Sequence, residues 1–371
     1  MKSITGCSAV WLAHLLWEQR VVSSNPTTPT IFLGIDMKKL AIFGLGHIGK
    51  YVYDTIDKNE FEVEGFDISQ GHDFNMDEVV RHLVKKFDGV LASTPFYVNK
   101  RIAAACNDYG VDYFDLTESI DVSQFVAGLQ NSKFIPQCGL APGMVSVIAN
   151  NMAKEFEEVR DIHIRVGALP QTVNNYMRYN RTWNTEGLIN EYCNLCITLK
   201  QGHILWADPL TDQETIFIDG IEFEAANTSG GIGTLANTYT QKAETVNYKS
   251  LRYPGHFQII RALKNDLGMK KNFNTFVDLF NKNIPETNLD VVYVVVNVSG
   301  YNGDKFSSRQ YIKTIKSNTE HTAIQIATGS GVLAVIDSWN KGNLDSHKGL
   351  LKQEDLDYNS IFNSKYAECY R

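Results

Sequence analysis

The sequence predicts an α/β fold in which a parallel sheet flanked by helices is followed by a second, α+β domain built on a mixed sheet. Three observations predict it. Short apolar runs alternate with helical segments from Met37 to about residue 156, a glycine-rich turn joins the first run to the first helix, and the later strands alternate apolar and polar residues. The chain has 371 residues, which is long enough for two domains with cores of their own.

Composition narrows the possible partners and the compartment. The net charge of −7 argues against a nucleic-acid partner, because phosphate binding needs a basic surface. No apolar run reaches the roughly 18 residues that a membrane span requires. The six cysteines do not form the dense framework of a secreted domain, so we expect a reducing cytoplasm. Cys193 and Cys196 form a lone CxxC without two further ligands at matching spacing, so we interpret them as packed thiols and expect no metal.

The first 36 residues do not resemble the rest of the chain. The apolar stretch 9–17 is too short to span a membrane and lacks a clear cleavage site, and 23–29 is rich in turn residues. Residues 23–26 can be encoded by AGT-TCG-AAT-CCC, which contains a run typical of a transfer-RNA T arm. We therefore hypothesise that this segment is a translated proline transfer-RNA gene and that Met37 is the natural start. The alternative is a genuine but disordered N-terminal arm.

The glycine-rich turn identifies the first domain. The apolar run 40–43 predicts a buried parallel strand, and residues 50–56 predict the helix that follows it. Between them, Gly44 permits a tight turn, Gly46 lets a pyrophosphate approach the backbone, and Gly49 lets the helix pack close to the strand. Because free N–H groups at the helix start attract phosphate, the pattern predicts a Rossmann dinucleotide-binding unit.

Asp67 supports the same interpretation and selects the cofactor. It ends the next expected strand, at 61–67, and lies 23 positions after Gly44. A carboxylate there accepts hydrogen bonds from ribose hydroxyls and repels a 2′-phosphate, so we predict NAD in preference to NADP. The other expected cofactor contacts lie at the start of this helix and in loops after later strands: His47, Ile48, Ser93, Thr94, Pro95, Ala141 and Pro142.

The elements continue in regular alternation through the first domain. We expect helices at 76–86, 99–109 and 144–156, and strands at 89–92, 112–115 and 134–138. In the second half we expect strands at 162–166, 214–218 and 291–296 and a glycine-rich loop at 228–233. Residues 322–339 have helical spacing that is interrupted by Gly329-Ser330-Gly331.

Two polar segments supply most of the candidate substrate contacts. Loops dense in Arg, Asn, Trp and Glu, such as 176–186, often hold small polar substrates, although a solvated loop has the same composition. In 252–256 an arginine suited to carboxylates precedes a histidine that could transfer protons near neutral pH. The candidate substrate residues are Arg178, Arg181, Asn184, Thr228, Ser229 and Arg252. The candidate catalytic residues are Asp115 and His256, with Glu118 and Glu186 in reserve.

Four motifs together resemble the saccharopine dehydrogenase family, including lysine 6-dehydrogenases. They are Gly139-Leu140-Ala141-Pro142-Gly143-Met144, Trp183-Asn184-Thr185-Glu186-Gly187-Leu188-Ile189, Asn227-Thr228-Ser229-Gly230-Gly231 and Leu251-Arg252-Tyr253-Pro254-Gly255-His256. The resemblance implies a Rossmann domain at 37–148, a substrate and dimerisation domain at 149–318, and a C-terminal segment at 319–371 that returns to the first domain. From Met37 the chain is shorter than most glutamate-forming members and closer in length to lysine 6-dehydrogenases.

The resemblance also implies an activity, namely NAD-dependent oxidation at the C–N bond of a lysine-derived amine in lysine metabolism. We expect a saccharopine dehydrogenase-like enzyme that forms a homodimer. Two alternatives stay open: a lysine 6-dehydrogenase, and a non-catalytic NAD-binding sensor or scaffold that keeps only the fold. Saccharopine has three carboxylates and would use several arginines, whereas free lysine has one carboxylate and needs fewer.

Overall fold

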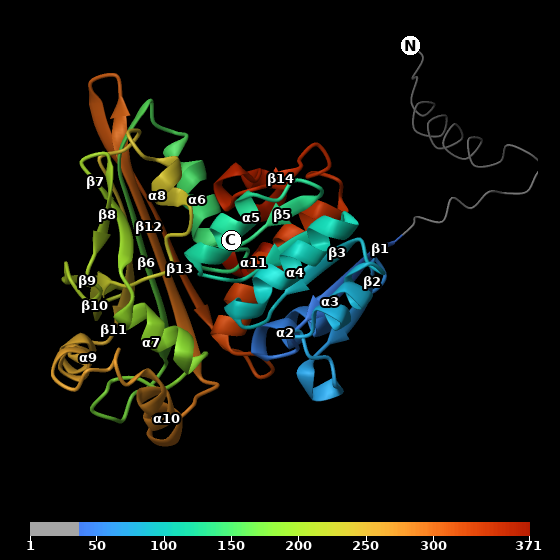
Figure 1. Cartoon of the computed structure of the whole chain (residues 1–371). Coiled ribbons are helices and arrows are strands. Elements are labelled where there is room, and N and C mark those ends of the chain that lie inside the picture. Colours follow the sequence, from blue (N-terminus) through green and yellow to red (C-terminus); the bar gives the residue numbers. More distant parts are fainter. Residues whose placement is uncertain (1–36) are drawn as a thin grey trace, which may run out of the picture. The chain divides into compact units, whose positions relative to one another are not determined.

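The computed structural model describes residues 37–371, and the hypotheses about residues 1–36 lie outside them. The described chain forms two sheets, one of six strands and one of eight (Figure 1). Helices flank the first sheet, and the second sheet is mixed. This confirms the predicted fold class.

The first sheet is parallel throughout, in the order β14-β5-β4-β3-β1-β2. Its first five strands in chain order are β1 (Lys38–Phe43), β2 (Phe61–Phe66), β3 (Gly89–Ala92), β4 (Asp112–Asp115) and β5 (Lys133–Ile135). The intervening segments are α2 (His47–Thr55), η1 (Ile68–Gln70), α3 (Asp77–Val84), α4 (Phe96–Tyr109) and α5 (Ile120–Ala127). Strand order reverses between β1 and β3, so a crevice for ligands is expected at the carboxyl ends of these strands.

The second sheet has the order β13-β12-β6-β11-β10-β9, with β7 and β8 attached beside β11. Its strands are β6 (Glu158–Pro170), β7 (Cys196–Lys200), β8 (His203–Ala207), β9 (Glu214–Ile218), β10 (Ile221–Asn227), β11 (Thr245–Arg252), β12 (Asp290–Asn302) and β13 (Lys305–Lys316). Strand β6 runs parallel to β11, and the other neighbouring pairs are antiparallel. The predicted strands at 162–166, 214–218 and 291–296 lie in β6, β9 and β12.

Each face of the second sheet packs against a different set of helices, because side chains alternate along a strand. Ile162 and Ile164 join a core that includes residues of α6 (Met144–Ala153) and α11 (Ala323–Asn340). Leu169 on the opposite face joins a separate core with residues of α7 (Thr185–Cys193), α9 (His256–Asn265) and α10 (Phe273–Asn283).

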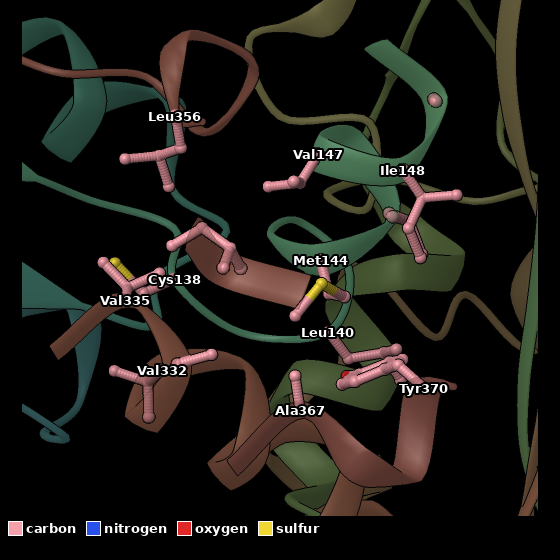
Figure 2. Packing of buried hydrophobic residues seen from close by; sticks show 14 of the residues in the cluster. Cys138, Leu140, Met144, Val147, Ile148, Val332, Val335, Leu356, Ala367 and Tyr370 are labelled. Carbon is pink, nitrogen blue, oxygen red and sulfur yellow. The ribbon is translucent and has the colours of Figure 1, made fainter. Parts of the chain in front are cut away.

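The first of these cores is continuous from the loop after β5 to the end of the chain. Figure 2 shows Leu140, Met144 and Val332 in this cluster together with Ala367 and Tyr370. The remaining C-terminal elements are β14 (Gly349–Leu350), η2 (Gln353–Asp355), α12 (Tyr358–Phe362) and η3 (Lys365–Tyr370). Strand β14 pairs with β5, so the end of the chain completes the first sheet.

Helix α11 runs without a break through the glycines that were expected to interrupt it. A Cβ on Gly329 would overlap the Tyr51 ring of α2, and one on Gly331 would lie 2.6 Å from the carbonyl oxygen of Gly139. These glycines therefore serve close packing, which outweighs their low helix propensity of about 1 kcal/mol each.

Within residues 37–371 no helix is both long and apolar enough to cross a membrane.

Candidate functional site

The glycine turn has the geometry that a dinucleotide needs. Gly44 has a φ of +90°, and a Cβ there would overlap the carbonyl oxygen of Ser93. A Cβ on Gly49 would overlap the carbonyl oxygen of Gly44, which explains the close approach of α2 to β1. The Cβ direction of Gly46 has no atom within 4 Å, and α2 starts there without a side-chain cap. The residues present therefore fit a pyrophosphate bound to the helix start.

Asp67 lies at the end of β2 and is tied to this turn. Its Oδ2 accepts a hydrogen bond of 2.8 Å from the backbone N–H of Leu45, and its Oδ1 accepts from the backbone and the hydroxyl of Ser69. The N–H groups of Ser69 and Leu45 lower the pKa of the Asp67 carboxyl, so it is ionised at neutral pH. The partly buried carboxylate is available to ribose hydroxyls and also holds the turn in place.

The other predicted cofactor residues lie at the start of α2 and in the loops after β3 and β5. Ser93 follows β3 and lies against Gly44, and Pro95 precedes α4. His47 and Ile48 form the first residues of α2, where His47 is exposed and its carbonyl accepts from Gln325 of α11. The remaining predicted residues are Thr94, whose hydroxyl donates to Asn99, the partly buried Ala141 and the buried Pro142. Their contacts with a cofactor stay predictions.

Glu118 brings the first domain into contact with the second. It follows β4, and a Cβ on Gly230 would overlap its Oε2 and lie 3.0 Å from its Cβ. Gly230 belongs to the loop between β10 and α8 (Leu235–Thr238), where Ser229 donates its backbone N–H to the carbonyl of Glu191 at 3.1 Å. The carboxyl-end loop of one domain and a loop and helix of the other therefore meet at one place, with two glutamates in it.

The two glutamates influence each other electrostatically. Burial, followed by the negative charge of Glu191, raises the pKa of the Glu118 carboxyl well above its usual value. Burial also raises the pKa of Glu191 to about 7, although the neighbouring Arg252 partly opposes the shift. Burial therefore favours the protonated form of both carboxyls more than water would, which is the kind of shift that acid–base groups show.

A chain of buried hydrogen bonds holds Glu191. Arg252, 2% exposed, donates to Oε2 of Glu191 at 3.2 Å and to the hydroxyl of Tyr192 at 2.7 Å. Tyr192 donates in turn to Nε2 of His256, whose Nδ1 donates to the carbonyl of Met177. The directions follow from chemistry, because a carbonyl can only accept and a guanidinium can only donate.

The sequence predicted proton transfer by His256, and the structure places its ring inside this chain of hydrogen bonds. Its ring is fully buried, and both nitrogens already have partners. Burial, reinforced by the charge of Arg252, lowers the pKa of His256 to about 3, so the ring is neutral at physiological pH.

Asp115 is also held in a network of buried hydrogen bonds. It is fully buried, and its carboxylate accepts from the hydroxyl of Tyr113 and from the backbone N–H groups of Thr117 and Gln137. Burial outweighs these three hydrogen bonds and raises its pKa to about 6. Asp115 therefore ties the end of β4 to the loop after β5, and no oxygen of it faces solvent.

The polar segment at 176–186 contributes less to the site than expected. Arg178 is exposed, and Arg181 donates to Asn281 and to the carbonyl of Ile284 at the end of α10. Asn184 caps α7 by accepting from the N–H of Gly187, and Glu186 is exposed in the first turn of that helix. Most of these polar residues therefore cap a helix or hold α10 in place.

The predicted pair Thr228 and Ser229 does lie beside the glutamates. Thr228 is buried and shares a hydrogen bond of 2.7 Å with the hydroxyl of Ser250. Ser229 binds the backbone of α7 through its N–H and its hydroxyl. Both residues therefore fix the loop that carries Gly230.

Glu191 and Tyr192 are the site residues that sequence reasoning missed. One signal was present: Leu188, Glu191 and Tyr192 have the spacing of one helix face, so a charged residue stands on a buried stripe. A buried charge lowers stability unless it is paired, so a charged residue on a buried helix face indicates a candidate functional residue.

Cys193 and Cys196 are buried free thiols. Burial raises the pKa of Cys196 to about 12, which keeps it protonated. Among the described residues, no group of three or more His, Cys, Asp or Glu side chains is arranged to hold a metal ion.

Comparisons with known proteins agree with this architecture. The saccharopine dehydrogenase C-terminal domain matches residues 139–365, more than half of the chain. Saccharopine dehydrogenase (L-Glu forming) from Saccharomyces cerevisiae superposes with a TM-score of 0.67 at 14% identity, covering 87% of this chain and 95% of the yeast chain. Homospermidine synthase from Legionella pneumophila, solved in complex with NAD, superposes with a TM-score of 0.61 at 14% identity, covering 90% and 89%. The resemblance seen in the four sequence motifs is thereby confirmed: the chain belongs to the saccharopine dehydrogenase family.

Proposed function

We propose that this protein is an NAD-dependent oxidoreductase that acts on the C–N bond of a lysine-derived amine. The observation that carries the proposal is the contact of Glu118, which follows β4 of the dinucleotide-binding sheet, with Gly230 of the second domain, whose neighbour Ser229 is hydrogen-bonded to the backbone of Glu191. Oxidation of an amine needs a group that removes a proton from nitrogen, and burial raises the pKa of both carboxyls, which increases their affinity for a proton. Family membership supports the same class of chemistry.

We assign a role to each site residue from its contacts. NAD, when bound, would supply the hydride acceptor. Glu118 has no hydrogen-bond partner among the described residues and is our choice for the group that takes the proton from the substrate nitrogen. Glu191 and Arg252 are fixed by the buried chain and orient the substrate, because an error of about 1 Å can cost about 10²-fold in rate.

Saccharopine and free lysine are the two substrates considered in the sequence analysis. Loss of a hydride to NAD would convert either amine into an imine, and water would then break the C–N bond: two amino-acid products would form from saccharopine, and ammonia would be released from the ε-carbon of lysine. Both reactions require deprotonation of nitrogen, so Glu118 serves either.

The test is the absorbance of reduced cofactor with the full-length protein, NAD or NADP, and either substrate. We expect reduction of NAD by at least one amine and a loss of about 10²-fold or more in kcat for Glu118→Gln, because the amide cannot accept the proton. Glu222→Gln, at an exposed position on β10, is the matched control. Cofactor binding without turnover of either amine would favour the sensor or scaffold alternative.

We also propose a homodimer formed through the face of the second sheet that carries His163 and Arg165 of β6. This sheet carries a cavity of about 210 Å³ that is lined by residues of β6, β9, β12 and β13. Exposed Phe217 and Ile312 at this cavity are apolar groups that a second copy would cover. Sedimentation of the parent and of Phe217→Asp tests this, and a monomeric parent would refute it.

A further inference from the structure

Glu354 is a buried carboxylate that the proposed reaction does not use. It lies in η2 near the end of the chain and is 4% exposed. Its Oε1 accepts hydrogen bonds from the hydroxyls of Thr234 at 2.9 Å and Thr238 at 2.6 Å, and its Oε2 accepts from Thr234 at 3.0 Å. Thr234 precedes α8 and Thr238 ends it, so one carboxylate holds both ends of this short helix.

The segment that carries Glu354 is fixed to the first sheet. Strand β14, which comes shortly before Glu354 in the chain, pairs with β5. The neighbouring Gln353 donates a hydrogen bond of 2.8 Å to the carbonyl of Pro136, in the loop after β5. Helix α8 follows β10 of the second sheet. The hydrogen bonds that Glu354 accepts from α8 therefore link the second domain to the sheet of the first.

Asn150 of α6 supports the same link. Its Nδ2 donates to the carbonyl of Glu354, and its Oδ1 accepts a hydrogen bond of 2.7 Å from the hydroxyl of Tyr239, which directly follows α8. The backbone of Glu354 and the end of α8 are thus joined through a second buried side chain.

The segment that Glu354 holds also makes the contact with Glu118. Gly230, against which Glu118 packs, lies four positions before Thr234. Gly233 packs against the loop after β5, where a Cβ on it would lie 2.9 Å from Oε1 of Gln137 and from Cβ of Pro142. Within the described chain these two glycines meet the first domain through packing alone, so the directional bonds of Glu354 set how closely the segment approaches.

Stability by itself does not account for a carboxylate at this position. Lys352 donates to the hydroxyl of Thr238 at 3.1 Å, and the partners of the Glu354 carboxylate in the described part of the chain are hydroxyls. A buried charge without an ion pair lowers stability, and apolar groups of similar volume are often neutral or stabilising in such places. A carboxylate adds direction, because hydrogen bonds have a preferred length and angle.

We infer that Glu354 is a positioning residue, which fastens α8 to the C-terminal segment and thereby keeps Glu118 in place against Gly230. We call Glu354, Thr234 and Thr238 together the α8 clasp. This inference rests on the proposed function and adds the end of the chain to the site. Because an error of about 1 Å can cost about 10²-fold in rate, opening the clasp should lower kcat. The dinucleotide turn between β1 and α2 makes none of these contacts, so NAD binding should not change.

The first measurement is amide hydrogen exchange of the full-length protein, which does not depend on turnover. Glu354→Ala should speed exchange about tenfold or more in residues 228–239 and in the loop 116–119. Asp337→Ala is the matched control, because Asp337 is fully buried and accepts a hydrogen bond of 2.7 Å from Ser364, while no hydrogen bond within the described residues joins it to α8. The control should lower the melting temperature and leave exchange in 116–119 unchanged.

The second measurement compares kcat with the NAD dissociation constant. Glu354→Ala should lower kcat about 10- to 100-fold and leave the dissociation constant unchanged. Glu354→Gln should restore most of the rate, because the amide oxygen still accepts from the threonines. Thr238→Val has nearly the same shape and removes one donor, so it should give a smaller loss. It also replaces Glu354→Ala in both measurements if that variant does not fold.

The inference and the proposed function fail in different ways. Unchanged exchange in 116–119 on opening of the clasp, or an equal change in Asp337→Ala, would overturn the inference. Turnover by Glu354→Ala at the rate of the parent would also overturn it and keep the oxidoreductase. Faster exchange in both segments, without reduction of NAD by any amine, would keep the α8 clasp as the support of Glu118 and refute the oxidoreductase.

Discussion

Glu118 of the dinucleotide-binding domain lies against Gly230 of the second domain, so closely that a Cβ on the glycine would overlap the glutamate carboxylate. The contact joins residues more than a hundred positions apart in the chain. It makes the position of the proposed proton acceptor depend on a loop of the other domain.

Replacing this glycine should therefore damage catalysis more than stability. Gly230→Ala adds a methyl group against Glu118 and also strains a backbone with a φ of +98°. We expect kcat/KM to fall about 10²-fold from displacement of the carboxylate, with a stability loss of about 1 kcal/mol from the backbone. Gly220→Ala is the matched control, because Gly220 has a φ of +79° but no atom within 4 Å of its Cβ direction. Equal kinetic losses in the two variants would show that the Glu118 contact does not matter.

Burial of neutral His256 should make stability depend on pH. Its folded pKa of about 3 lies below the unfolded value near 6.5, so between these values the unfolded chain binds a proton that the folded chain does not. The parent should thus lose stability as pH falls below 6.5, by about 2 kcal/mol at pH 5 from this residue. Denaturant unfolding at pH 7 and pH 5 should show the destabilisation by His256→Gln shrinking at the lower pH. Exposed His347→Gln serves as control, and a pH-independent difference for His256→Gln would contradict the assignment.

Asp67 should control both cofactor affinity and cofactor choice. Asp67→Ala removes the acceptor for ribose hydroxyls and for the Leu45 N–H, and we expect NAD affinity to fall about tenfold or more with weaker discrimination against NADP. Asp67→Asn keeps one acceptor without the charge, which separates hydrogen bonding from repulsion. Fluorescence titration with both cofactors measures the effect, with Glu64→Ala on exposed β2 surface as control. A parent protein that already prefers NADP would refute the role of Asp67.

Removal of residues 1–36 should leave the fold and the NAD site intact. The first sheet begins with β1 at Lys38, which is hydrogen-bonded to β2 and β3, and the described residues form one unit from there to Arg371. We expect the same melting temperature and the same NAD dissociation constant in the full-length and truncated proteins. A markedly lower melting temperature after truncation would show that the N-terminal segment contributes to folding.

The fold class and the dinucleotide turn could be predicted from the sequence because their signals are local. Gly44, Gly46 and Gly49 act on atoms within one turn and its adjoining strand, and apolar runs report burial of strands one at a time. The resemblance to the family rested on four such local motifs. Arg252 could be selected as a candidate from its motif, and Glu118 could be held in reserve because it follows a predicted strand.

Tertiary structure decided what those candidates contact. Arg252 was expected to bind a substrate carboxylate and His256 to transfer protons; the packing of α7 and α9 against the sheet also ties both of them to Tyr192, and Arg252 to Glu191. Glu191 was not noticed, because its significance comes from Glu118, whose position depends on the packing of two domains. Gly329 and Gly331 look like a helix break in the sequence and instead admit Tyr51 and Gly139. Local sequence patterns determine where helices and strands form. Burial and the charges of distant residues set the pKa and the role of each site residue, and these influences arise only when the chain is packed.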